Sequence, residues 1–182
     1  MTRPRGRPAG GAGLEQHAII EQALALLEEG GGQGLTMRAL AARLGVSPMS
    51  LYRHVGDRAA LLQALSDRVY AGVLDAEAGQ ADARAALAAL LLRYHATVAR
   101  HPQLTLALFA APDALAGVTG RITARLAELL AALTDAPLAW RDILVDHAHG
   151  SGLAIAAHAG GQAALHTGYR QALERLLDRL AA

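Results

Sequence analysis

The stretch that decides the fold reads TMRALAARLGVSPMSLYRHV and covers residues 36–55. Thr36 is a favourable N-cap for a first short helix, and Gly45 supplies the unusual backbone angles of a tight corner. Ser47 caps a second short helix, with Pro48 at the first helical position, where its missing N–H costs nothing. Two short helices joined by a tight corner are the layout of a helix-turn-helix.

The second of these helices has the composition of a DNA-reading helix. To enter the major groove, such a helix must be short, exposed and polar on one side. Thr36 and Arg38 begin the first helix, where a contact with the DNA backbone is expected. An ordinary helical hairpin in an all-α domain remains the alternative. The hydrogen-bonding and aromatic side chains of the second helix are Ser47, Ser50, Tyr52, Arg53 and His54.

Three segments, TMRALAARLGVS, LYRHV and GDRAALL, make the pattern more specific. Over roughly residues 14–74 the sequence resembles the DNA-binding domain of the TetR (tetracycline-repressor-like) family of bacterial regulators. The rest of the chain is similar to that family in length and helical layout. The resemblance implies that Tyr52 and His54 anchor phosphates, although Tyr52 could pack against the helix expected over residues 14–29 and His54 could cap its own helix. The DNA-contacting residues that it implies within this domain are Thr36, Arg38, Ser47, Pro48, Ser50, Tyr52, Arg53, His54 and Arg58.

The arm before the domain carries a second DNA signal. Residues 3–8 read RPRGRP and resemble the core of an AT-hook. A narrow A·T minor groove attracts arginine, so Arg3, Arg5 and Arg7 are candidates for minor-groove contacts. The alternative is a solvated basic tail that supplies only non-specific attraction.

Composition predicts an all-α protein of about nine helices. Hydrophobic residues make up 53% of the 182 residues, aromatic residues only 3%, and helix-forming Ala and Leu dominate. We expect a flexible basic arm over 1–13, a helix-turn-helix domain over 14–74 and a ligand-binding and dimerisation domain over 83–182. The helices are expected at 14–29, 36–44, 47–55, 57–73, 83–100, 102–110, 112–133, 137–159 and 162–181. A bend near Gly117 and Gly120 is an alternative to a straight helix over 112–133.

Charge and cysteine content exclude several classes of protein. The formal net charge is +1, which excludes a uniformly basic coat but leaves room for a local basic patch. The absence of cysteine excludes disulfides, thiolate metal sites and thiol nucleophiles. The basic N-terminus lacks the apolar run of a signal peptide, and the uncharged stretch 147–169 is too polar for a membrane span. A cytoplasmic protein without membrane association is expected.

The many histidines could indicate an enzyme or a metal site, but their spacing along the chain does not support either. His147 and His149 lie roughly 200° apart around a helix, and His147 and His158 share a face but stand about 16 Å apart. No metalloprotease motif, phosphate-binding loop or serine elbow is present. We therefore predict no catalytic residue, no metal and no cofactor.

A cavity for an unknown small-molecule effector is the better interpretation of the second half. For a drug–magnesium chelate, the resemblance implies a histidine ligand in the connection before Pro112. Residues 106–111, LALFAA, offer no such ligand, so tetracycline is not predicted as the effector. Core packing or surface exposure is the alternative for each candidate lining residue. The candidates are Tyr94, His95, His101, Phe109, Trp140 and His147.

The last two helices are predicted to form a dimer surface. A long apolar stripe runs along the last helix, and Gly150, Ala154 and Ala157 make a smooth face on the helix before it. Two such helices from each chain would form a four-helix bundle, as the resemblance implies. Burial of both stripes within one chain is the alternative. The stripe consists of Leu165, Tyr169, Leu173, Leu176 and Leu180.

Taken together, these features favour a homodimeric, ligand-responsive transcription regulator, a repressor, on a near-palindromic DNA site. Two helix-turn-helix units would enter successive major grooves about 34 Å apart. The alternative is a helical carrier or enzyme whose N-terminal domain docks a partner. The arginine arm and the short capped helix favour the regulator.

Overall fold

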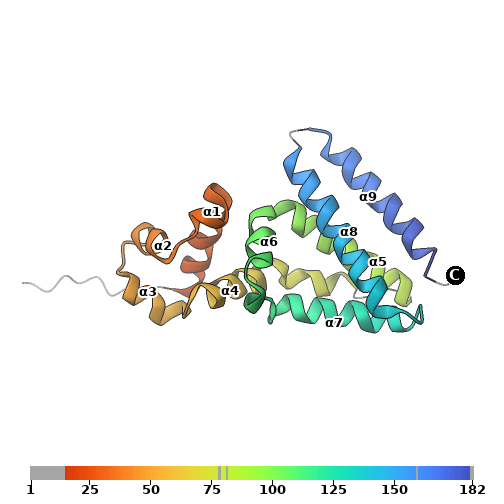
Figure 1. The fold of residues 1–182 in the computed structure, drawn as a ribbon, viewed down its shortest axis with the longest axis horizontal. Helices are drawn as coiled ribbons and strands as arrows, with labels where there is room; N and C mark the ends of the chain where they lie inside the picture. Colours follow the sequence, from red (N-terminus) through yellow and green to blue (C-terminus); the bar gives the residue numbers. More distant parts are fainter. Residues whose placement is uncertain (1–14, 78, 81, 159, 181–182) are drawn as a thin grey trace, which may run out of the picture.

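The computed structural model describes residues 15–77, 79–80, 82–158 and 160–180 (Figure 1). In these ranges the chain is all-α, as predicted, with nine α-helices and two 3-10 segments and no strand. The N-terminal helices are α1 (Gln16–Gly34), α2 (Met37–Arg43), α3 (Pro48–Val55) and α4 (Arg58–Tyr70). After the 3-10 segment η1 (Ala71–Glu77) come α5 (Ala83–Arg100), α6 (Pro102–Phe109), the 3-10 segment η2 (Pro112–Leu115), α7 (Val118–Ala131), α8 (Pro137–Ala157) and α9 (Gln162–Leu177).

The predicted helix starts in the N-terminal part are confirmed by their capping bonds. The Thr36 hydroxyl accepts a hydrogen bond from the Ala39 N–H at 3.1 Å, and the Ser47 hydroxyl accepts one from the Ser50 N–H, also at 3.1 Å. Gly45 has a φ of +67°, a conformation that glycine adopts without steric cost, and it makes the corner between α2 and α3.

Glycines account for the two clearest differences from the predicted helices. The first helix was expected to end at the triple glycine, but α1 continues to Gly34 with a kink at Gly31, whose φ is 62° and ψ −164°. A single non-helical residue bends the helix here without ending it. The bend considered near Gly117 in the helix expected over 112–133 is a break, which divides that segment into η2 and α7.

The body of the molecule is a bundle around α5. This helix packs against α7, α8, α9 and η1, and its buried residues include Leu87, Leu90 and Leu91. At the other end, α1 and α4 both contact α6, so α4 connects the end formed by α1–α3 to the bundle (Figure 1). One contiguous buried cluster contains residues from Ile19 to Leu180. The boundary between residues 74 and 83 therefore stays a prediction.

None of the helices in the described part of the chain is both long enough and apolar enough to cross a bilayer.

Candidate DNA-binding surface and ligand cavity

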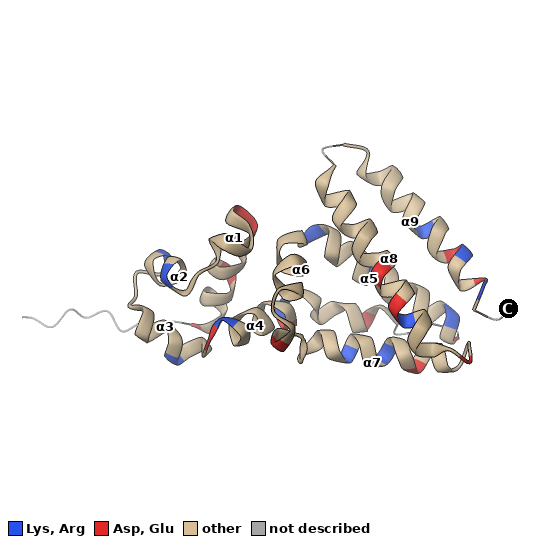
Figure 2. Ribbon diagram, in the orientation of Figure 1, with Lys and Arg blue, Asp and Glu red and all other residues tan. Residues whose placement is uncertain are grey.

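Helix α3 stands at one end of the molecule with its apolar residues turned inward. Leu51 is fully buried and Val55 nearly so, whereas Tyr52 is 45% exposed and Met49 is 72% exposed. Arginines of α2 and α3 lie on this end of the molecule (Figure 2). The helix thus has the buried face and the exposed polar face that entry into the major groove requires.

An ion pair fixes α2 against α1. The Arg43 guanidinium donates two hydrogen bonds to the Glu29 carboxylate, at 2.6 and 2.8 Å, and a third to the Gln22 side chain at 2.9 Å. The Arg43 guanidinium lowers the pKa of the Glu29 carboxyl below its ordinary value. These bonds set the orientation of α2 on α1, and α2 in turn packs against α3.

The predicted DNA-contacting residues mostly share one exposed surface. Ser50 and Arg58 are half-buried, and Arg58 donates a hydrogen bond to the Gly32 carbonyl at 3.2 Å. A shallow concave surface between the end of α1, α2 and α3 is lined in part by Arg38, Tyr52 and Arg58. The exposed candidates are Thr36, Arg38, Ser47, Pro48, Tyr52, Arg53 and His54.

Met49 is a candidate contact that the sequence analysis missed. Among the large hydrophobic residues of the described chain it is the most exposed, and it stands in the first turn of α3. The sequence signal for this contact was a methionine between Pro48 and Ser50, in the first turn of the helix that is expected to read DNA. Arg3, Arg5 and Arg7 lie outside the described residues.

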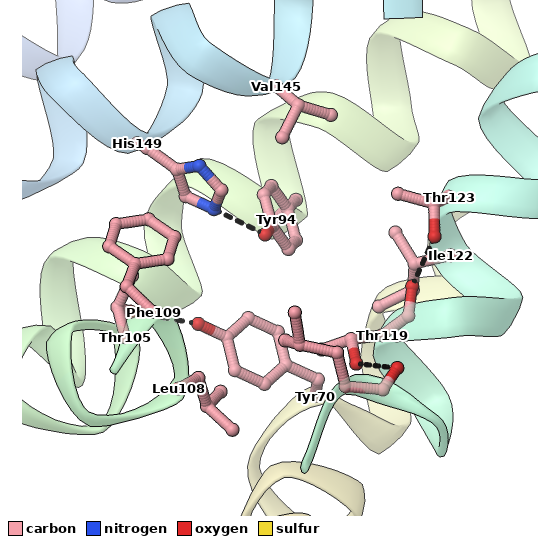
Figure 3. A pocket seen from close by; sticks show the side chains of 11 residues that line it. Tyr70, Tyr94, Thr105, Leu108, Phe109, Thr119, Ile122, Thr123, Val145 and His149 are labelled. Carbon is pink, nitrogen blue, oxygen red and sulfur yellow. Dashed lines mark hydrogen bonds between the residues drawn. The ribbon is translucent and has the colours of Figure 1, made fainter. Parts of the chain in front are cut away.

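A cavity of about 200 Å³ lies between α4, α5, α6, η2, α7 and α8 (Figure 3). None of its lining residues is an arginine, an aspartate or a glutamate. The lining consists of Tyr70, Tyr94, Thr105, Leu108, Phe109, Leu115, Thr119, Ile122, Thr123, Val145 and His149.

Two hydrogen-bonded pairs supply much of the polarity of this cavity. The Tyr94 hydroxyl lies 2.6 Å from Nε2 of His149, and the Tyr70 hydroxyl lies 3.0 Å from the Thr105 hydroxyl (Figure 3). Burial raises the pKa of both tyrosines and lowers the pKa of His149. All three side chains are therefore uncharged at neutral pH.

Only two of the six predicted ligand-binding residues, Tyr94 and Phe109, line this cavity. The other four do not line it. His95 is buried, stacks on the Tyr169 ring with centroids 3.6 Å apart and lies 3.1 Å from the Ser151 hydroxyl. His147 stacks on the same tyrosine ring.

The last two candidates that do not line this cavity lie elsewhere in the bundle. Nδ1 of His101 lies 3.5 Å from the Glu28 carboxylate, and Trp140 is half-buried against the core. His149 and Tyr70 line the cavity but were not among the predicted lining residues. Tyr70 ends α4 and therefore fell within the predicted DNA-binding domain, not within the predicted ligand-binding domain.

The predicted dimer stripe requires a correction. Tyr169, Leu173 and Leu180 are buried within the chain itself because α9 packs against α5 and α8, so they are not available to a partner. Leu165 and Leu176 are half-exposed. Among the residues predicted to form the dimer interface, Gly150 and Ala154 on α8 are exposed.

Helix α4 meets the bundle at two points beside the cavity. Its Tyr70 forms part of the cavity wall, and its Asp67 carboxylate accepts a hydrogen bond from the Val118 N–H at 2.6 Å, at the start of α7. A Cβ atom at position 117 would overlap the Asp67 carboxylate, so Gly117 is what permits this approach. The helix that follows α3 is thereby anchored to the cavity wall.

Comparison with known proteins finds a family model that matches the N-terminal helices. The family model described as bacterial regulatory proteins, tetR family, matches residues 19–65, the segment that contains α2 and α3. Over this segment the chain is similar to the TetR family.

Curated relatives match part of the chain. The HTH-type transcriptional repressor DrrR1 of Streptomyces coeruleorubidus is 39% identical over 87 residues, which are 47% of this chain and 32% of that protein. The class D tetracycline repressor protein of Escherichia coli is 45% identical over 60 residues, 33% of this chain and 28% of that protein. The matches thus span about a third of each relative. Both relatives are named as repressors.

A solved structure extends the likeness to the whole fold. The structure of BioQ with its double-stranded DNA operator superposes with a TM-score of 0.72 at 24% identity and covers 93% of this chain and 99% of that one. At that identity the match establishes the fold.

Proposed function

We propose that the protein is a homodimeric transcription regulator, a repressor that binds a near-palindromic DNA site and leaves it when a small molecule fills the cavity. The observation that carries this proposal is the position of α4. Only two residues separate this helix from the end of α3, and its last residue, Tyr70, lines the cavity. The cavity and the DNA-reading helix are therefore joined by one rigid element.

The DNA-binding part of the proposal rests on α3 and its surroundings. Seven of the predicted contacts are exposed on one end of the molecule, and the family match covers this segment. The Thr36 and Ser47 hydroxyls accept capping bonds, so each retains a hydrogen that it can donate to a phosphate oxygen. The arginine arm is proposed to add minor-groove contacts. A protein that regulates bacterial DNA in this way acts in the cytoplasm.

The dimer is proposed to form through the outer faces of α8 and α9. Gly150 and Ala154 are exposed on α8, and Leu165 and Leu176 are half-exposed on α9. Small residues on one helix permit close approach, and the half-exposed leucines supply apolar area. Such a four-helix interface would hold two α3 helices for successive major grooves, about 34 Å apart.

Ligand control is proposed to act through differential affinity. A ligand can shift a two-state equilibrium only by as much as its affinities for the two states differ. Tyr70 gives the cavity a direct contact with α4, and the Asp67–Val118 hydrogen bond ties α4 to the start of α7, a helix that lines the cavity. A ligand that displaces Tyr70 or shifts α7 would tilt α4 and change the spacing of the two α3 helices.

Selection from a pool of random duplexes of about 30 base pairs would test the proposal, because no operator sequence is needed. The full-length protein should enrich a near-palindrome whose half-sites are one helical turn apart. Binding to the enriched duplex should weaken steeply with salt; if the dimer neutralises about eight phosphates, log K should fall against log salt with a slope near −7. Enrichment of no sequence, together with a flat salt response, would favour a carrier or enzyme.

A further inference from the structure

We propose that the cavity takes a small, uncharged molecule that carries a hydrogen-bond donor on an aromatic body, of which a simple alkylphenol is the type. This inference rests on the proposed function only in treating the cavity as the effector site. It adds the chemical class of the effector, which the lining residues indicate through their size, charge and hydrogen-bond directions.

Size and charge limit the ligand first. The cavity volume is about 200 Å³, below the roughly 300–1,000 Å³ of drug-sized sites but above the roughly 150 Å³ that accepts benzene in an engineered core. None of the eleven lining residues is an arginine or carries a carboxylate. An ion entering the cavity would therefore lose its hydration without meeting an opposite charge.

The direction of each hydroxyl bond limits the polar group of the ligand. The Thr105 hydroxyl donates its one hydrogen to the His101 carbonyl at 3.2 Å. The 3.0 Å bond between Tyr70 and Thr105 must then have the tyrosine as its donor, because threonine has no second hydrogen to give. The Tyr70 oxygen therefore has a lone pair free for a ligand.

Two further hydroxyls follow the same pattern. The Thr119 hydroxyl donates to the Leu115 carbonyl at 2.9 Å, and the Thr123 hydroxyl donates to the Thr119 carbonyl at 2.8 Å (Figure 3). Their hydrogens are used within their own segment, so their oxygens offer acceptors only. Among the lining groups, only the Tyr94–His149 pair can present a hydrogen in one of its tautomers.

A surplus of acceptors selects a ligand that donates. A carboxylate or phosphate brings acceptors alone and would face lone pairs, whereas a phenolic hydroxyl supplies the missing hydrogen. Aromatic rings complete the match. The Tyr70 and Tyr94 ring centroids are 5.5 Å apart, and the Phe109 ring meets His149 edge-on at 4.8 Å, so a ligand ring would enter an aromatic enclosure.

A matched ligand series tests the inference on the full-length protein. Binding of 4-ethylphenol, 4-ethylanisole and 4-ethylbenzoate is measured by isothermal titration calorimetry. The three share one body and differ in whether they donate, only accept or carry a negative charge. We expect the phenol to bind at least about tenfold more tightly than the ether, the value of one hydrogen bond to a buried acceptor. We expect no measurable binding of the benzoate.

Two variants of α8 locate the binding. Val145→Phe places a larger side chain in the cavity and should abolish phenol binding. Ile143→Phe makes a similar enlargement on the same helix at a position that is 49% exposed, and it should bind the phenol like the unaltered protein.

Four outcomes would overturn the inference: equal binding of the ether, binding of the benzoate, binding of none of the three, or retained phenol binding in Val145→Phe. Selective phenol binding that leaves DNA affinity unchanged would support the ligand class and instead contradict the proposed effector role.

Discussion

The DNA-binding end and the ligand cavity are assembled in opposite ways. The end is built from neighbours in sequence: Thr36 and Ser47 cap their own helices, and Gly45 makes the corner between them. The cavity takes its walls from six segments, with Tyr70 and His149 brought together from positions far apart in the chain. Side chains on the first region face outward, so changing them should alter binding and spare the fold. Changes in the second region should alter both.

The largest expected effect is at the DNA-binding end. Replacing Tyr52 and Arg53 together by alanine removes two exposed side chains that we expect to donate to phosphates. Each such bond contributes about 1.5 kcal/mol or more, so affinity for the selected duplex should fall about 100-fold. The free energy of unfolding should change by less than about 0.5 kcal/mol. Fluorescence anisotropy and urea unfolding measure the two.

Arg121→Ala on α7 is the matched control, because it removes an exposed arginine from the bundle. It should leave DNA affinity unchanged. Equal loss in this control would mean that the bundle, and not α3, carries the DNA-binding surface.

The next effect tests the joint between the two regions. Asp67→Ala removes the carboxylate that accepts from the Val118 N–H and leaves that buried donor unpaired. The free energy of unfolding should fall by about 1–2 kcal/mol. Gly117→Ala should have a similar cost because its Cβ overlaps the same carboxylate. In both variants, a ligand that binds the cavity should release DNA less effectively.

Asp113→Ala, an exposed position in η2, is the control for these two variants and should behave like the unaltered protein. If Asp67→Ala retains full ligand control of DNA binding, coupling passes through Tyr70 alone.

The same difference in construction decides what the sequence could predict. Caps and corners are local, so the helix-turn-helix and its exposed residues followed from the spacing of Thr36, Gly45 and Ser47. Periodicity placed His147 and His149 on opposite sides of α8 but could not say which side faces a cavity. In the structure His149 faces it, and His147 stacks on Tyr169.

The apolar stripe of α9 shows the same limit. A helix that covers its own bundle and a helix that covers a partner have the same pattern, and only the path of the chain distinguishes them. Leu173 lies on the side of α9 that covers its own bundle, against α5 and α8, and is buried there. Leu176 is half-exposed.

A third prediction concerns acid. Burial, together with the nearby His166 and His147, lowers the pKa of His95 to about 4. Between this value and its ordinary pKa of about 6.5, the unfolded chain binds more protons than the folded one. Stability from this group is therefore complete above pH 6.5 and is lost as the pH falls toward 4, with a limiting slope of about 1.4 kcal/mol per pH unit.

Urea unfolding across this pH range should show a shallower slope in His95→Phe, which retains a ring to stack on Tyr169 but cannot titrate. His17→Gln, an exposed histidine on α1, should leave the slope unchanged. An unaltered slope in His95→Phe would assign the acid sensitivity to other buried histidines.

The smallest expected effect lies in the support of α2. Arg43→Lys keeps the positive charge but cannot form the two parallel bonds to Glu29. Both partners are substantially exposed, so the unfolding free energy should fall by less than about 1 kcal/mol. DNA affinity should fall only a few-fold, because α2 loses orientation while every contact on α3 remains. Arg141→Lys, which changes an ion pair on α8, should alter neither quantity. A loss as large as that of the Tyr52 and Arg53 double variant would show that Arg43 itself contacts DNA. In that case Glu29 would compete with the phosphates for Arg43, and Glu29→Gln should raise DNA affinity. If Arg43 only supports α2, Glu29→Gln should instead lower DNA affinity.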